Sequence, residues 1–357
     1  MSPAMTMEKV RFGKTGLRVS RVAFGGIPIM RIPKAEGVAL LRETVGLGIN
    51  FIDTAHGYSD SEEKIGEAIR GMKRDELVIS SKSPADDKKT FNEHLDLSLK
   101  RLGVDHIDIY HLHNVSSEKR RDAVLAPGGA LEGLLEAIGA GKVRFPAFSG
   151  HSIPIASKMM KSGKFDVVQI PFNYIEHDAE EELFPLAKEL DMGFIAMKPM
   201  GGGLLDDAGL SFRYLLRYDG IVPDPGIEKI EEIREIAGIV EKKAPLSGED
   251  WKKIESLRAE YGSSWCHRCG YCQPCPQGIP ISTLLALKST VKRFTPEAAY
   301  AMNGPSIEKA RTCVECGACM PRCPYQLNIP KLLKENVKYW DSQMGGKFGS
   351  VSDGKIP

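Results

Sequence analysis

The first 265 residues of this 357-residue chain contain no cysteine, and all eight cysteines fall between residues 266 and 323. No block of like charges stands out and the net charge is +1, which argues against binding to nucleic acid or to a membrane surface. Long hydrophobic runs and an N-terminal signal core are also missing, so we expect no membrane span and a cytoplasmic location. In that reducing compartment, clustered cysteines favour metal ligation over disulfides.

After a short hairpin at 7–20, the chain alternates regularly between strand-like apolar runs and helix-like amphipathic runs. The expected strands are 21–26, 50–55, 77–82, 106–113, 144–151, 166–173, 193–200 and 220–226. Eight strand–helix units in about 220 residues predict an α/β fold of the closed parallel (β/α)8 barrel type, a TIM barrel.

The composition changes after the eighth helix-like run, which predicts four segments. Residues 1–243 form the barrel and 244–262 a helical connector capped by Ser247. Residues 263–340, rich in Cys, Pro and short helical pieces, form a small, mainly α-helical metal domain. Residues 341–357 are Gly-rich and polar, and we expect a flexible tail there.

The cysteines form two runs, each ending in Cys-Pro. The first is C-x2-C-x2-C-x2-C-P, at Cys266, Cys269, Cys272 and Cys275. The second is C-x2-C-x2-C-x3-C-P, at Cys313, Cys316, Cys319 and Cys323. In such runs three thiolates hold one [4Fe-4S] cluster and the fourth reaches the other cluster, so we expect Cys323 to join the first three of the first run and Cys275 to join those of the second.

Two structural zinc sites are the alternative for these runs, but zinc sites use pairs of cysteines and not successive quartets. The pattern resembles that of two-cluster ferredoxins, and the long spacer after Cys275 resembles the helical ferredoxin modules of respiratory iron–sulfur subunits. The spacing before Cys275 is x2 where x3 is usual, which makes its cross-ligation the weakest part of the assignment.

Four polar residues follow successive expected strands of the barrel: Asp53, Tyr58, Lys82 and His113. The active site of such a barrel lies where its strands end. This set suits carbonyl reduction, because a phenol with an ordinary pKa near 10 gives up its proton readily only beside a cation. Tyr58 would be the acid, Lys82 its activator, Asp53 the anchor of Lys82, and His113 the group that orients the carbonyl oxygen.

Each of these residues also has a structural interpretation, since an Asp at a strand end often caps a turn and a loop Tyr often only packs. Four such coincidences at successive strand ends are less expected than one shared site. We assign His106, His111 and His151 to packing, with contact between His151 and a substrate as the lesser alternative.

The segments "GINFIDTAHGYSDSEEKIGEAI", "ELVISSK" and "HIDIYHLHN" resemble the aldo-keto reductase family, whose motifs carry the same tetrad. The resemblance extends over about residues 7–240 and implies a nicotinamide cofactor, NAD(P)H, bound extended across the barrel mouth. By position, Ser149 and Gln169 match the family residues that hold the nicotinamide carboxamide. Lys198 would meet a cofactor phosphate or stay solvated.

Departures from the family pattern concern the same cofactor. Gly150 stands in place of the usual Asn, and Met197 in place of an aromatic residue that stacks on the nicotinamide. Gly226 and Glu232 occupy the positions of a Lys and an Arg that hold the adenosine 2′-phosphate, and a carboxylate there would repel that phosphate. The resemblance therefore leaves NADPH, NADH and a cofactor-free barrel open.

Three functions fit these observations. The first is nicotinamide-dependent reduction of a small carbonyl compound, or oxidation of the alcohol, with two [4Fe-4S] clusters that exchange electrons with a redox partner protein. In the second, the barrel binds a substrate that is reduced through the clusters without nicotinamide. In the third, the clusters are structural or sense oxygen. The complete tetrad favours the first.

Overall fold

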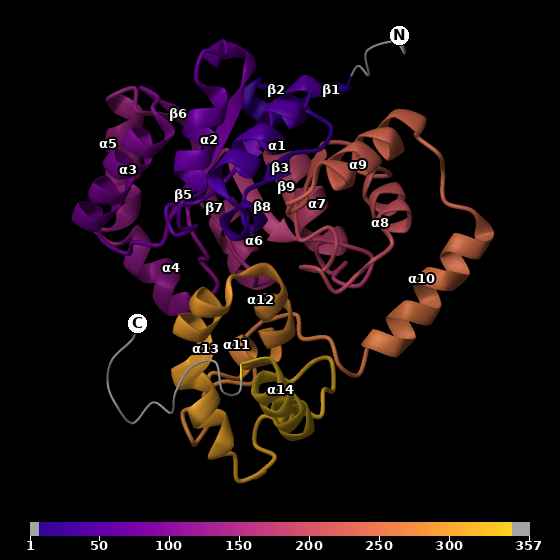
Figure 1. Cartoon of the computed structure of the whole chain (residues 1–357). Helices are drawn as coiled ribbons and strands as arrows, with labels where there is room; N and C mark the ends of the chain where they lie inside the picture. Colours follow the sequence, from indigo (N-terminus) through magenta and orange to yellow (C-terminus); the bar gives the residue numbers. More distant parts are fainter. Residues whose placement is uncertain (1–6, 345–357) are drawn as a thin grey trace. The chain divides into compact units, whose positions relative to one another are not determined.

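The computed structural model describes residues 7–344, which divide into two compact units with the boundary between Arg258 and Ala259. The first unit is built around a parallel sheet surrounded by helices, and the second is helical (Figure 1). The boundary falls inside the stretch 244–262 that we expected to be a connector.

The sheet of the first unit has eight strands in chain order, all parallel. They are β3 Phe24–Gly25, β4 Phe51–Asp53, β5 Val78–Ser83, β6 Ile107–Leu112, β7 Val143–Ser149, β8 Val167–Pro171, β9 Gly193–Met197 and β10 Ile221–Asp224. A parallel bridge between Gly25 and Gly226 joins the two edges of the sheet. The predicted (β/α)8 barrel is therefore confirmed, although its first strand is much shorter than the expected run 21–26.

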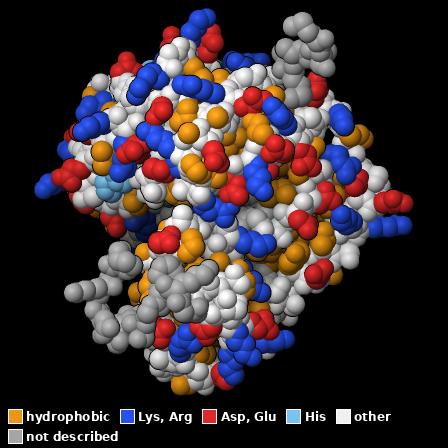
Figure 2. Space-filling model, viewed as in Figure 1, with side chains coloured by type: hydrophobic (Ala, Val, Ile, Leu, Met, Phe, Trp, Pro, Cys, Tyr) orange, Lys and Arg blue, Asp and Glu red, His pale blue; other side chains and the backbone are white. Residues whose placement is uncertain are grey.

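Helices cover the outside of the sheet and each buries one face. They are α1 Lys34–Gly46, α2 Ser61–Ile69, α3 Lys88–Leu102, α4 Glu118–Leu125, α5 Ala130–Gly139, α6 Ile153–Lys161, α7 Ala179–Glu189, α8 Ala208–Leu215 and α9 Ile230–Lys242. In α9 the buried residues Ile233, Ile236, Ala237 and Val240 recur at helical spacing, so this stripe faces the sheet. On the face drawn in Figure 2, acidic and basic side chains are interspersed over the surface.

A hairpin closes the N-terminal end of the barrel. Its strands β1 Lys9–Arg11 and β2 Arg18–Ser20 are antiparallel and joined through the 3-10 turn Gly13–Thr15. Phe12, Leu17 and Val19 from the hairpin belong to the apolar cluster at the bottom of the barrel. The ring of Phe12 lies where a Cβ on Gly193 would be, only 2.5 Å from it. The barrel is thus a packed core at this end, and a site can open only at the other.

Helix α10 Gly248–Tyr261 continues the first unit beyond the barrel. The Arg213 guanidinium donates to both carboxylate oxygens of Asp250, at 2.6 and 2.7 Å. The guanidinium of Arg217 lies 4.5 Å from the centroid of the Trp251 ring. These contacts pack the helix against α8, so it acts as an additional helix of the barrel unit.

The second unit has a core of its own among short helices. They are α11 Ile281–Leu285, α12 Leu287–Arg293, α13 Pro296–Arg311 and α14 Ile329–Met344. Trp340 and Met344 of α14 are buried in this core, and partly buried cysteines pack against it. The predicted tail at 341–357 is therefore wrong for its first four residues, which are helical because Met344 is buried, and 345–357 lie outside the described residues. Within 7–344 no helix is long and apolar enough to cross a membrane.

Candidate active site

A layer of mainly polar side chains lies inside the barrel, directly above the apolar layer and nearer the C-terminal ends of the strands. The apolar layer comprises Ala23, Phe51, Val78, Ile109, Ala147, Val167, Ile195 and Val222. Side chains along a strand alternate between its faces, so the residue two positions later also points inward. This second layer reads Gly25, Asp53, Ser80, His111, Ser149, Gln169, Met197 and Asp224. It contains four of the predicted site residues and three polar residues that were not predicted to belong to the site.

The three polar residues that were not predicted to belong to the site are Ser80, Asp224 and His111, the last of which had been assigned to packing. The Ser80 hydroxyl donates to Asp53 Oδ1 at 2.7 Å and lies 3.0 Å from His111 Nε2. Burial and the nearby Lys82 charge lower the pKa of His111 to about 3, so its imidazole is neutral. Counting two residues onward from the inward-facing apolar residue of each strand would have identified all three from the sequence.

Asp53 and Lys82 form an ion pair inside the polar layer. Lys82 Nζ donates to Asp53 Oδ2, and also to the Thr54 carbonyl at 2.6 Å. Burial alone would raise the pKa of the Asp53 carboxyl, but the Lys82 ammonium outweighs burial and the pKa is lowered. Burial likewise opposes the Lys82 charge, yet Asp53, Tyr58 and Asp224 raise the pKa of the ammonium. Both groups are therefore charged at neutral pH.

Tyr58 and His113 complete the predicted tetrad at the barrel mouth. Tyr58 lies in the turn between β4 and α2, where its N–H donates to the Ala55 carbonyl at 3.0 Å. Lys82 Nζ is 5.6 Å from the centroid of the Tyr58 ring, and the His113 ring is edge-on to it at 6.0 Å. Burial, followed by the Lys82 charge, lowers the pKa of His113 to about 3. A neutral imidazole and a phenol thus face each other beside a cation.

Gln169 connects the tetrad to the far side of the barrel. Its Nε2 donates to Asp53 Oδ2 at 3.1 Å and to Asp224 Oδ2 at 3.0 Å. Among the described residues its buried Oε1 has no hydrogen-bond partner, and the same is true of Asp224 Oδ1. Two buried acceptor atoms are therefore left for something that is not part of the chain.

A second polar group lies at the ends of β7 and β9. Ser149 Oγ accepts the N–H of Asn114 at 2.9 Å, which leaves its own hydroxyl proton to donate. Lys198 Nζ is 2.8 Å from His151 Nε2, and His151 Nδ1 is 3.1 Å from Asn114 Oδ1. With Lys198 charged, this fixes the tautomer, because Nε2 accepts and Nδ1–H donates. The half-buried Met197 precedes Lys198 at the end of its strand.

The loop before α9 and the first turn of α9 hold the residues that replace the family's usual cations. Gly226 is exposed, and a Cβ there would meet the Pro28 ring at 2.8 Å. Glu232 Oε2 accepts the N–H groups of Glu228 at 3.0 Å and Lys229 at 3.1 Å. A carboxylate of the chain itself therefore satisfies the N-terminus of α9, where an anion would otherwise bind.

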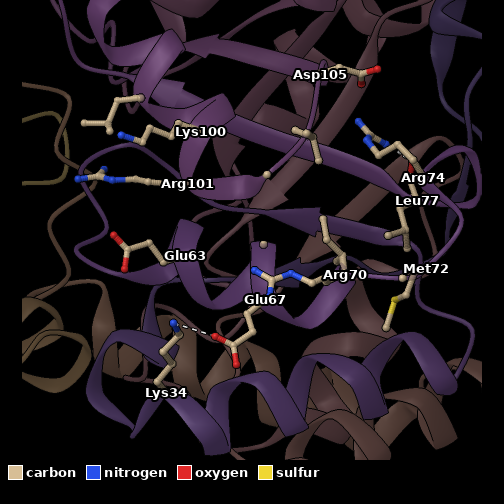
Figure 3. A pocket seen from close by; sticks show the side chains of 16 residues that line it. Lys34, Glu63, Glu67, Arg70, Met72, Arg74, Leu77, Lys100, Arg101 and Asp105 are labelled. Carbon is tan, nitrogen blue, oxygen red and sulfur yellow. Dashed lines mark hydrogen bonds and ion pairs between the residues drawn. The ribbon is translucent and has the colours of Figure 1, made fainter.

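A cavity of ≈890 Å³ lies elsewhere. It is an open groove on the flank of the barrel between residues of α2 and α3, lined by charged side chains such as Glu63, Arg70 and Lys100 (Figure 3). No member of the tetrad lines it. We therefore take the barrel mouth, and not this groove, as the candidate active site.

The cysteines gather into two groups in the second unit. Cys266, Cys269, Cys272 and Cys323 line one cavity together with Leu327 and Ile329. Cys319 lies near Cys275, Cys313 and Cys316, whose thiols, after burial, raise its pKa. Burial also raises the pKa of Cys266 to about 12 and that of Cys272 to about 11.

Each group has the membership of one expected quartet, and ligation of a metal or cluster by these cysteines stays a prediction. Within the described part of the chain, no three His, Cys, Asp or Glu side chains are arranged to hold a single metal ion.

Comparison with known proteins identifies both units. Residues 21–211 match the model of the aldo/keto reductase family, and residues 265–329 match a 4Fe-4S dicluster domain. The chain is 30% identical over 225 residues to L-galactose dehydrogenase of Arabidopsis thaliana, which covers 57% of this chain and 69% of that protein. It is 29% identical over 217 residues to the aldo-keto reductase YhdN of Bacillus subtilis, covering 56% and 64%. The alignments with the curated relatives span 62% to 70% of their length.

Solved structures support the same fold. An aldo-keto reductase from Bacillus halodurans in its holo form superposes with a TM-score of 0.61 at 22% identity, over 70% of this chain and 96% of that one. An aldo-keto reductase from Klebsiella pneumoniae in complex with NADPH gives a TM-score of 0.61 at 23% identity, over 71% and 96%. At such identities the likeness establishes the fold alone.

Proposed function

The chain belongs to the aldo/keto reductase family, here joined to a 4Fe-4S dicluster domain, and on that basis we propose that it reduces a small carbonyl compound, or oxidises the alcohol, with a nicotinamide cofactor. The observation that carries the proposal is the buried ammonium of Lys82 between Asp53 and the Tyr58 ring. A cation in that place is of use to a phenol that must release a proton.

In the proposed reaction Tyr58 protonates the carbonyl oxygen as hydride reaches the carbonyl carbon. Lys82 stabilises the phenolate that forms, and Asp53 holds Lys82 in place. His113 is neutral because its pKa is lowered, so its N–H can donate to the carbonyl oxygen without being an acid itself. The reverse direction uses the same groups, with the phenolate as the base.

The barrel mouth fits a nicotinamide. The buried and unpartnered Oε1 of Gln169 is an acceptor for the amide N–H of the carboxamide, and the Ser149 hydroxyl is free to donate to its carbonyl. Lys198 follows the last residue of β9, and its ammonium, which also lies 2.8 Å from His151 Nε2, would meet a cofactor phosphate. When bound, the cofactor supplies the hydride.

We further propose that the cofactor is NADH. The 2′-phosphate of NADPH would approach the start of α9, which Glu232 already occupies with a carboxylate bonded to two N–H groups. Like charges repel, and no cation stands at position 226. This departs from the Klebsiella pneumoniae relative, which is solved with NADPH.

For the second unit we propose two [4Fe-4S] clusters, one held by Cys266, Cys269, Cys272 and Cys323 and the other by Cys275, Cys313, Cys316 and Cys319. The cavity that the first four cysteines line together supports this. When bound, the clusters supply one-electron transfer, which requires a redox partner protein and a reducing compartment such as the cytoplasm.

The test is a Tyr58→Phe variant of anaerobically purified protein. Carbonyl reduction should fall by about 10²- to 10⁴-fold in kcat, because one general acid is removed. Quenching of NADH fluorescence should give an unchanged Kd. Tyr110→Phe, a matched change in the same barrel, should retain activity. Absence of nicotinamide binding at millimolar concentration, or full activity of Tyr58→Phe, would overturn the proposal.

A second candidate function is reduction of a barrel-bound substrate through the clusters without nicotinamide. The observation in its favour is the occupied N-terminus of α9, which removes one usual anchor of the cofactor. Here dithionite-reduced clusters, followed by EPR, should be reoxidised by a carbonyl compound alone. Reoxidation only in the presence of NAD(P)+ or not at all excludes this candidate.

A further inference from the structure

Asp224 is a buried carboxyl in the polar layer that the proposed reaction does not use. It ends β10, and its side chain belongs to the interior layer two residues above Val222. It is 8% exposed, and its Oδ1 has no hydrogen-bond partner among the described residues. A carboxyl in such a place is costly unless it is neutral or paired. Within the described structure its side chain accepts from the Gln169 amide and not from a lysine or an arginine.

Asp224 is connected to the tetrad through Gln169. The amide Nε2 of Gln169 is shared between Asp224 Oδ2 at 3.0 Å and Asp53 Oδ2 at 3.1 Å. Both carboxyls are buried, and both accept from this one nitrogen atom. Two carboxylates held this close together in a buried site repel each other, which favours a proton on one of them. The geometry therefore favours one carboxylic acid in the pair.

The backbone makes room for this arrangement. A Cβ on Gly25 of the neighbouring strand would lie 2.9 Å from Asp224 Oδ1 and 2.6 Å from the Pro225 carbonyl oxygen. A larger residue at position 25 would push the carboxyl away from Gln169. The glycine and the aspartate thus depend on each other across the point where the barrel closes.

The surrounding charges decide which carboxyl holds the proton. Asp53 faces Lys82 and also accepts from Ser80, whereas the charge that acts most strongly on Asp224 is the Asp53 carboxylate itself. Burial, then Asp53, raises the pKa of Asp224 well above its usual range, while Lys82 lowers it only in part. From β6 the facing group is His111, which is neutral. Of the two carboxyls, Asp224 is therefore the one that keeps its proton to higher pH.

We propose that Asp224 is a positioning residue for the tetrad: in its protonated form it holds the Asp53 carboxylate, with Gln169, against Lys82. When the pH rises through the raised pKa of Asp224 and its proton leaves to the solvent, a second negative charge faces Lys82. Lys82 then stabilises the Tyr58 phenolate less well, so proton donation weakens. The role in catalysis rests on the proposed function, but the proton on Asp224 does not.

The first experiment compares pH profiles of kcat and KM for the wild type, Asp224→Asn and Asp224→Ala. The amide of Asn also donates to Asp53 and cannot ionise, so Asp224→Asn should retain neutral-pH kcat within about threefold and shift the alkaline limb to higher pH. Asp224→Ala should lose about tenfold or more in kcat with little change in KM. Asp219→Asn, an exposed control, should change neither. An alkaline limb that is identical in wild type and Asp224→Asn would overturn the proposal.

The second experiment needs no activity. The pKa of Asp224 is raised above the roughly 3.9 of an unfolded Asp, so the folded state binds the proton more tightly. Its stabilising contribution is complete below that pH and is lost as the pH rises toward the folded pKa. Over this window the unfolding constant of the wild type, relative to Asp224→Asn, should rise by up to about tenfold per pH unit.

The two experiments separate two failures. A pH-independent ratio of unfolding constants would mean that Asp224 carries no proton, which overturns the inference whatever the enzyme does. The expected pH dependence in a protein that reduces no carbonyl compound would support the proton on Asp224 and reject the proposed function. The infrared carbonyl band of a protonated carboxyl, present in wild type and absent in Asp224→Asn, is the direct readout.

Discussion

Lys82 and Asp53 are joined across adjacent strands by an ion pair in which the two side chains are only 2% and 4% exposed. Removing one partner leaves the other charge buried and unpaired. Lys82→Met or Asp53→Asn should therefore cost about 3 to 5 kcal/mol of the free energy of unfolding. The double variant should cost less than the sum of the two, by about 1 to 3 kcal/mol, in urea titrations.

A surface pair provides the control for this cycle. Lys88 and Glu136 are also ion-paired, but their side chains are 33% and 52% exposed. Water screens such a pair, so the same cycle with alanine should give no measurable coupling. Equal coupling in both cycles would mean that burial of the Lys82 pair does not matter.

The same pair gives stability a defined dependence on pH. The pKa of Asp53 is lowered, so its contribution exists above the unfolded value of about 3.9 and is lost as the pH falls. The pKa of Lys82 is raised, so its contribution exists below about 10.4 and is lost as the pH rises. The Tm of the wild type should exceed that of the Lys82→Met/Asp53→Asn double variant most clearly between these two pKa values. An equal difference in Tm at pH 3 and at pH 7 would contradict this.

The crossed ligation of the clusters can be tested by asking which Cys→Ser variants alter the same EPR signal. Cys323→Ser should alter the EPR signal of the same cluster as Cys269→Ser, although the two residues belong to different runs. Cys275→Ser should alter the other signal, together with Cys316→Ser. Ser282→Ala, which changes the lining of the first cavity without removing a thiol, should keep the full iron and sulfide content. If Cys323→Ser altered the same EPR signal as Cys316→Ser, each run would hold its own cluster.

Glu232 should set the cofactor preference. We expect NADH to be used with a higher kcat/KM than NADPH, and Glu232→Ala to raise the relative value for NADPH several-fold by removing a repulsive carboxylate. The variant should also lose about 1 kcal/mol of stability, since Glu232 caps α9. Glu231→Ala, one residue earlier and exposed, should do neither. A wild-type preference for NADPH would contradict the role of Glu232.

The packing of Phe12 at the bottom of the barrel should leave no room for a side chain at position 193. Gly193→Ala places a methyl group 2.5 Å from the Phe12 ring, so we expect a loss of about 1 to 3 kcal/mol in chemical unfolding. At Gly238 in α9 a Cβ would meet nothing within 4 Å, so Gly238→Ala should be neutral or slightly stabilising. Similar losses for the two variants would mean that Phe12 moves freely.

Periodicity and spacing were sufficient to determine the fold of this protein. Strand-like runs at regular intervals indicated the barrel, since parallel strands with covering helices have few other arrangements, and the match to the family bears this out. The cysteine runs likewise indicated an iron–sulfur domain, because ligand spacing is local. The roles of the tetrad stay predictions, although Tyr58 and His113 do lie together.

Only the tertiary structure decided how the interior groups share protons and hydrogen bonds. Nothing near Asp224 in the sequence indicates that it meets Gln169, 55 positions earlier, or that Gly25 leaves it room. Closure of the barrel brings the first and last strands side by side and excludes water from the carboxyls between them. The charge state of a buried group depends on those neighbours, and a one-dimensional pattern does not contain them.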